Sequence, residues 1–177
     1  MKIAALLVAG LLLQAGPATK PAPMRLPEEC PRLLLTWHPG MPMPTTPPAE
    51  IGPAIVAAVW DSGTVLRAES IDRPFGGQVI GAMAASQRDA LLQSVSASAI
   101  WTRQSMVFPD APSLVLAWNR GSDLMRYAQS PTAADKLTDL ETLRAQVFAV
   151  KLQRVRTLSA PVAIDRWKCP AERAERD

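Results

Sequence analysis

Several residue combinations that catalytic and metal sites need are missing from this sequence. Its 177 residues include one histidine, His38, and two cysteines, Cys30 and Cys169. A Ser-His-Asp triad would have to use His38, and no serine stands in the Gly-x-Ser-x-Gly turn that presents a hydrolase nucleophile. A structural zinc site needs four ligands, and the chain has no cluster of cysteine and histidine. We therefore expect a non-catalytic role.

Charge of one sign is not concentrated in the chain. Nineteen lysines and arginines stand against sixteen aspartates and glutamates, which gives a formal net charge of +3. The densest basic cluster, Lys151, Arg154 and Arg156, has no interleaved aromatic residues that could stack on bases. We interpret this cluster as a solvated face and expect no binding to nucleic acid.

Long hydrophobic runs are absent apart from one near the start of the chain, from Ile3 to Leu13. Lys2 precedes that run and small residues follow it up to Ala18, which is typical of a secretory signal peptide. An uncleaved membrane anchor is the alternative, but the run is short for a hydrocarbon core of about 30 Å. We therefore predict a signal peptide at residues 1–18, a secreted or periplasmic protein, and no membrane span once the signal is removed.

The two cysteines predict a disulfide, because an oxidising compartment favours their pairing. Each is followed by proline, so both lie where regular structure stops. A bridge between Cys30 and Cys169 would tie the first ordered residues to the last, and loop entropy gives such a bridge up to about 5 kcal/mol of stabilisation. Two unpaired thiols are the alternative.

Proline divides the chain into segments. Prolines crowd residues 39–53, which excludes a helix or an interior strand there. We predict a proline-rich N-terminal segment at residues 19–53 with a short strand near residues 32–37. A single domain is predicted at residues 54–169, followed by a charged tail at residues 170–177.

Runs of β-favouring residues predict hairpins within that domain. Residues 54–60 and 64–70 flank a turn whose third residue, Gly63, can adopt the positive φ of a bulged hairpin. A second hairpin is predicted to turn at residues 119–121. Further strands are predicted at residues 78–82, 148–152 and 161–167.

Two helices are predicted from apolar residues that recur at helical spacing. The first begins with a capping box formed by Ser86 and Asp89, and the second begins at Ser130, which is followed by a first-turn proline. The second helix is expected to end near Ala145, although the pattern of residues 148–152 is also compatible with its continuation. These elements predict an α+β fold, a small antiparallel sheet built from hairpins with two main helices packed on it.

Two tryptophans raise the question of an internal repeat. Trp60 and Trp118, with the turns that follow them, match at a constant offset of 58 residues. Hairpin turns draw on the same few residue types, so we interpret these matches as coincidence rather than duplication. Trp60, Trp101, Trp118 and Trp167 are expected to fill the core, each with its indole N–H on a backbone carbonyl.

Soft donor atoms gather in one proline-rich stretch, Trp-His-Pro-Gly-Met-Pro-Met, which begins at Trp37. Imidazole nitrogen and thioether sulfur together favour Cu(I) or Ag(I). The stretch resembles the metal loop of the small periplasmic copper and silver chaperones, although here the histidine adjoins the tryptophan. The resemblance implies His38, Met41 and Met43 as ligands and the tryptophan as a cap on the ion. We interpret the stretch as a stiff loop and keep the soft-metal site as the alternative.

Two pairs of carboxylates are close in the sequence, Glu69 with Asp72 and Asp135 with Asp139. Such pairs are more typical of a solvated surface, and a carboxylate-based enzyme is the second alternative. The sequence therefore predicts an exported, non-catalytic protein that binds another protein or an envelope component through its sheet or a hairpin edge.

Overall fold

The computed structural model describes residues 24–40, 53–71, 73–105, 107–108, 110–130, 138–163, 166–167 and 169. The predicted signal peptide and the predicted charged tail lie outside these residues. None of the helices in the described ranges is long and apolar enough to cross a membrane.

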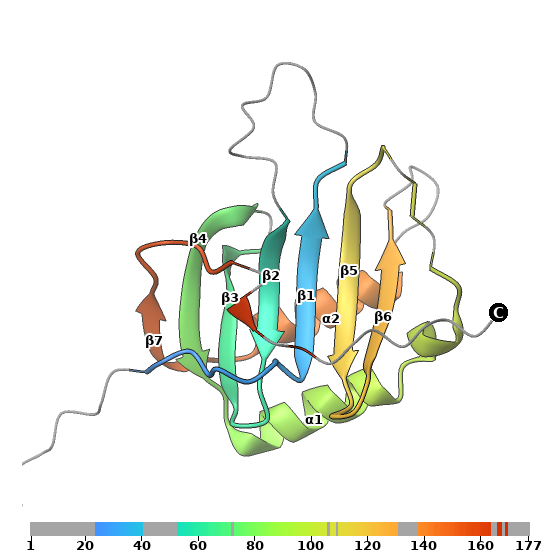
Figure 1. The fold of residues 1–177 in the computed structure, drawn as a ribbon. Helices are drawn as coiled ribbons and strands as arrows, with labels where there is room; N and C mark the ends of the chain where they lie inside the picture. Colours follow the sequence, from blue (N-terminus) through green and yellow to red (C-terminus); the bar gives the residue numbers. More distant parts are fainter. Residues whose placement is uncertain are drawn as a thin grey trace, which may run out of the picture.

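Seven strands form one antiparallel sheet (Figure 1). In chain order they are β1 (Leu33–His38), β2 (Ala54–Val59), β3 (Thr64–Ser70), β4 (Arg73–Ala82), β5 (Ser113–Asn119), β6 (Leu124–Gln129) and β7 (Gln153–Thr157). Their order across the sheet is β6-β5-β1-β2-β3-β4-β7. β1 therefore lies inside the sheet, between β5 and β2, although the sequence prediction assigned it to the N-terminal segment.

Two helices, α1 (Ala85–Ser96) and α2 (Thr138–Ala149), lie on one face of the sheet, the far face in Figure 1. A short 3₁₀ helix, η2 (Ala99–Thr102), follows α1. The buried residues of both helices join one hydrophobic cluster with strand residues, and this cluster includes Leu91, Val95, Leu140, Leu143 and Val147. The predicted α+β class, with an antiparallel sheet and two helices, is confirmed.

An arginine on β3 holds the end of α2. The Nη1 atom of Arg67 donates to the carbonyls of Val147 at 3.0 Å and of Phe148 at 2.7 Å, and its guanidinium lies 5.2 Å from the centroid of the Phe148 ring. A cation is favourable there because the last carbonyls of a helix carry partial negative charge. Burial lowers the pKa of Arg67.

Two predicted boundaries near α2 are wrong. The helix continues to Ala149 instead of ending near Ala145, so residues 148 and 149 are helical rather than extended. The alternating pattern that predicted a strand also fitted a helix, and the long-range contact of Arg67 with the final carbonyls favours the helix. The strand forms only from Gln153, as β7.

The start of α1 and the last predicted strand also differ from the prediction. The residue that caps α1 is Ala84, which has no side-chain hydrogen bond, and Ser86 lies inside the first turn, so the predicted capping box is absent. Residues 161–163 and 166–167 do not form a strand. The N–H of Val162 donates to the side chain of Gln78 at 2.8 Å instead of to a neighbouring strand.

The second face of the sheet carries the two ends of the described chain. We call residues 24–32 and the described residues of 158–169 the terminal segments, and Figure 1 shows them crossing the near face. Their side chains pack on a second cluster of buried residues, which consists of Ile55, Ala58, Trp60, Leu66 and Trp167. The sheet is therefore covered by helices on one face and, over part of the other, by its own chain ends.

Tryptophans and a disulfide hold the terminal segments in place. The indole N–H of Trp60 donates to the carbonyl of Glu29 at 2.9 Å, and that of Trp167 donates to the carbonyl of Pro27 at 3.0 Å. The two rings meet edge to face with their centroids 5.2 Å apart. The predicted disulfide between Cys30 and Cys169 is confirmed, and it joins two positions that are 139 residues apart in the sequence.

The two tryptophans matched by the offset of 58 do not occupy equivalent places. Trp60 belongs to the cluster under the terminal segments, whereas Trp118 belongs to the cluster under the helices, with the guanidinium of Arg32 over its ring. Their turns also close differently: the N–H of Trp60 donates to Thr64, whereas that of Arg120 donates to Asp123. The matches in the sequence therefore do not mark a structural repeat.

Candidate functional site

The predicted soft-metal ligands are only partly within the described residues. His38 is the last residue of β1, and its Nε2 lies 3.0 Å from the hydroxyl of Thr36. Trp37 packs against the cluster under the helices, and neighbouring residues of a strand point to opposite faces, so its ring lies across the sheet from the imidazole. Met41 and Met43 lie outside the described residues, so the soft-metal site stays a prediction.

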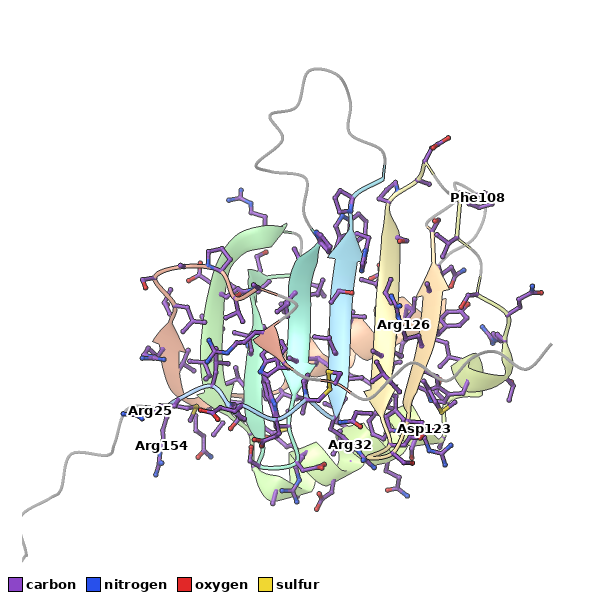
Figure 2. All side chains as sticks on the ribbon, in the orientation of Figure 1. Arg25, Arg32, Phe108, Asp123, Arg126 and Arg154 are labelled. Carbon is purple, nitrogen blue, oxygen red and sulfur yellow. A yellow bond between two sulfur atoms is a disulfide. The ribbon has the colours of Figure 1, made fainter. Side chains whose placement is uncertain are left out.

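His38 has a neutral imidazole over a wider pH range than an exposed histidine. Burial lowers the pKa of His38 below 6.5, and the positive charge of Arg126 lowers it further. Arg126 is on β6, two strands away from β1, and is labelled over the near face in Figure 2. A neighbouring cation also repels a bound metal cation, so this setting does not favour the soft-metal alternative.

This lowered pKa predicts an acid-sensitive stability. The unfolded chain, with a histidine pKa near 6.5, binds the proton more readily than the folded chain, so stability falls as pH falls below about 6.5. We expect the urea midpoint to decrease from pH 7 to pH 5 and His38→Gln to make that decrease smaller. Equal pH dependence in the two proteins, measured by far-UV circular dichroism, would contradict this expectation.

Neither predicted carboxylate pair lies wholly within the described residues. Glu69 accepts a hydrogen bond from the hydroxyl of Thr157 at 3.4 Å, which links β3 to β7. Asp72 and Asp135 lie outside the described residues, as does the side chain of Asp139. The carboxylate-based enzyme stays a prediction. Among the residues that the structure describes, no group of three His, Cys, Asp or Glu side chains is placed to hold a metal ion.

One edge of the sheet is covered by a loop of the same chain. At β6, the N–H of Ala128 donates to the hydroxyl of Ser105 at 3.1 Å, and the N–H of Phe108 donates to the hydroxyl of Ser130 at 3.1 Å. The segment that follows η2 therefore runs along β6 and occupies part of its hydrogen-bonding edge.

The opposite edge, β7, is exposed along its whole length. All five of its residues are exposed, and the side chain of Val155 is among the most exposed large apolar groups of the described chain. We call β7 together with the preceding Lys151 the basic edge, because Lys151, Arg154 and Arg156 are all exposed there. Figure 2 labels Arg154 at this end of the molecule.

The basic edge contains a bulge. Arg156 pairs with Ile80 and Gln153 pairs with Ala82, so Arg154 and Val155 together face the single residue between those partners, Gly81. Arg154 accordingly has a φ of 53°. The partner residue is glycine for a steric reason, since a Cβ atom at Gly81 would lie 2.9 Å from the Cβ atom of Leu152.

A pocket of about 480 Å³, which we call the front pocket, adjoins the basic edge. Its lining combines the last residues of β7 with both terminal segments: Leu26, Arg156, Thr157, Leu158, Ser159, Ala160, Pro161, Val162, Ala163 and Arg166. Two arginines and several apolar side chains therefore share one depression. Arg25, next to the lining residue Leu26, is labelled at the same end of the molecule in Figure 2.

A second pocket, of about 350 Å³, lies between the helices. The hydroxyl of Ser94 on α1 donates across it to the amide oxygen of Gln146 on α2 at 3.3 Å. Its lining residues are Gln87, Ala90, Leu91, Ser94, Gln146, Ala149 and Val150, none of which carries a charge. The described lining of this pocket therefore offers hydrogen-bonding side chains but no charge.

Sequence patterns did not indicate the front pocket. The cluster Lys151, Arg154 and Arg156 is visible in the sequence, but its lack of interleaved aromatic residues indicates only a solvated face. Leu26 and Arg166 are 140 residues apart in the sequence, and only the packing of the two terminal segments brings them to one pocket. Comparisons with models of protein families, with curated proteins and with solved structures found no match to this chain.

Proposed function

We propose that this protein is a non-catalytic binding protein that takes an extended acidic segment of another protein along the basic edge. The observation that carries the proposal is the exposure of all five residues of β7 at the end of the sheet. An edge strand directs the N–H and C=O groups of alternate residues outward, where an incoming strand can pair with them.

The charge of the edge indicates the kind of partner. Lys151, Arg154 and Arg156 attract acidic side chains and repel basic ones, and Val155 offers an apolar contact between two of these cations. A second copy of the chain is disfavoured, because pairing β7 with β7 would bring arginines against arginines. An extended segment that alternates acidic and apolar residues fits this edge best.

The same charges disfavour indiscriminate pairing through this edge. Cationic side chains, a bulge and a short strand are the features by which exposed edges avoid indiscriminate pairing. They leave pairing available to a partner that neutralises the charge. The disulfide between Cys30 and Cys169 supports the proposed secreted or periplasmic location, because such bonds persist in oxidising compartments.

Fluorescence anisotropy of a labelled ten-residue peptide of alternating glutamate and valine tests this proposal. We expect the peptide to bind and the affinity to fall as salt is raised. A peptide of alternating lysine and valine should not bind. Arg154→Glu should weaken binding about threefold to tenfold, since an exposed charge contributes modestly and reversal replaces attraction by repulsion.

The matched control is Arg120→Glu, the same change at an exposed arginine in the turn between β5 and β6. It should leave the affinity unchanged. Equal binding of the acidic and basic peptides, or equal weakening by the two variants, would rule out the basic edge as the binding surface.

A further inference from the structure

We propose that the front pocket binds an amphipathic organic anion, with a carboxylate or phosphate head and a short apolar body. This site adjoins the basic edge and shares Arg156 with it, and it adds a small-molecule ligand to the proposed protein partner. The features that carry the inference are two arginines, an apolar lining and a rigid framework, all in one depression of suitable size.

The two arginines define the charge of the ligand. Arg156 belongs to β7, and Arg166 belongs to the terminal segment formed by the described residues of 158–169. Both line the front pocket. No acidic side chain is among the described residues of the lining. A guanidinium presents a planar fork of N–H donors that matches the two oxygens of a carboxylate or phosphate, which makes arginine well suited to this head group.

The remaining side chains define the body of the ligand. Leu26, Leu158 and Val162 line the pocket and also pack on the buried cluster beneath the terminal segments. A volume of about 480 Å³ lies within the range of small-molecule sites, which are typically about 300–1,000 Å³. Apolar surface beside two cations selects a molecule that carries both an anionic end and a hydrocarbon end.

A buried glutamine fixes the wall of the pocket. Gln78 is 3% exposed, and its side chain donates to the carbonyl of Ile55 at 3.3 Å and accepts from the N–H of Val162 at 2.8 Å. Its backbone carbonyl accepts from the N–H of Leu158 at 2.8 Å. The segment from Leu158 to Val162 is therefore held at both ends by one residue of β4.

The disulfide fixes the two walls relative to each other. Leu26 precedes Cys30 by four residues, and Arg166 precedes Cys169 by three, so the covalent bond joins the segments close to both lining residues. A site that is ordered before its ligand arrives loses little entropy on binding. This arrangement is what a preformed ligand site requires.

Isothermal titration of the oxidised protein with octanoate, octyl phosphate, octanol and octylammonium tests the inference. We expect octanoate, octyl phosphate or both to bind, and the stronger of the two identifies the head group. Arg166→Gln and Arg156→Gln should each weaken that binding about tenfold, in line with the loss of a hydrogen bond between charged groups.

Arg154→Gln is the matched control, because it removes the same charge from the same strand at a residue that does not line the pocket. It should leave octanoate binding unchanged, and thermal melting should show that all three variants are folded. The inference is overturned if neither anion binds at millimolar concentration, if octylammonium binds as well as octanoate, or if Arg154→Gln weakens binding as much as Arg166→Gln.

The two proposals can fail separately. Loss of peptide binding in Arg154→Glu with octanoate binding intact would support both sites. A protein that binds octanoate but not the acidic peptide would contradict the proposed partner while retaining the pocket. A protein that binds the acidic peptide but neither octanoate nor octyl phosphate would contradict the pocket alone.

Discussion

Replacing Cys30 and Cys169 together by serine is expected to lower the free energy of unfolding by up to about 5 kcal/mol. The bond joins positions 139 residues apart, so its loss releases a long loop in the unfolded chain. The measurement is urea denaturation of the oxidised protein and of the double variant, followed by far-UV circular dichroism at the same pH. Reduction of the unmodified protein should reproduce the result of the double variant.

Loss of the disulfide should loosen the terminal segments more than the rest of the fold. The bond connects the terminal segments, whereas the strands and helices are held by their own pairings and by the cluster under the helices. At low urea we therefore expect the double variant to keep the circular dichroism of the folded sheet and helices. An unchanged urea midpoint, or a reduced protein that is as stable as the oxidised one, would show that the bond does not constrain the fold.

Trp60→Ala is expected to lower the free energy of unfolding by about 3–5 kcal/mol, the usual range for truncating a large buried aromatic residue. Trp60 is 1% exposed, its indole N–H bonds the carbonyl of Glu29, and its ring meets that of Trp167. The variant loses contacts to both terminal segments and leaves a cavity between them and the sheet. Urea denaturation measures the change.

Trp101→Ala provides the matched control for that variant. Trp101 is half-buried, packs against the cluster under the helices and bonds the carbonyl of Val95, so its truncation should cost less and should not involve the terminal segments.

A double-mutant cycle measures how far the effects of the disulfide and of Trp60 on stability depend on each other. Without the disulfide, the terminal segments are less firmly held on Trp60, so Trp60→Ala should cost less in the double serine background than in the oxidised protein. Trp101→Ala should cost the same in both backgrounds. Additive costs for Trp60→Ala would contradict the link between this residue and the terminal segments.

Local patterns predicted the local features of the fold. Gly63, with a φ of 82°, stands in the turn that the run Asp-Ser-Gly indicated between β2 and β3. Leu91 and Val95 of α1 are buried, as their helical spacing indicated. The disulfide followed from the number of cysteines and the expected compartment. Each of these inferences needed only neighbouring residues or a count.

Features that depend on distant partners could not be predicted in the same way. β1 is short and apolar, and nothing in its own residues indicates that it pairs with both β2 and β5. The end of α2 depends on Arg67, which is about 80 residues earlier in the chain. Indole N–H bonds to carbonyls were predicted, but the partners Glu29 and Pro27 were not.

The candidate site could be predicted from the sequence only in part. Its cations were visible in the sequence as the cluster Lys151, Arg154 and Arg156, but their position on an unpaired edge depended on the order of the strands. The other edge strand, β6, carries a single cation, Arg126. That edge is covered by the segment after η2, through the bonds of Ala128 to Ser105 and of Phe108 to Ser130, which also depend on the fold.

Hydrogen exchange of the oxidised protein, free and saturated with the alternating glutamate and valine peptide, tests the central claim most directly. Pairing of the peptide with the basic edge predicts slower exchange of the amides in β7 (Gln153–Thr157) and no change in β6 (Leu124–Gln129). Slower exchange in β6 alone, or no change in β7 at saturating peptide, would contradict the proposal that β7 is the binding edge.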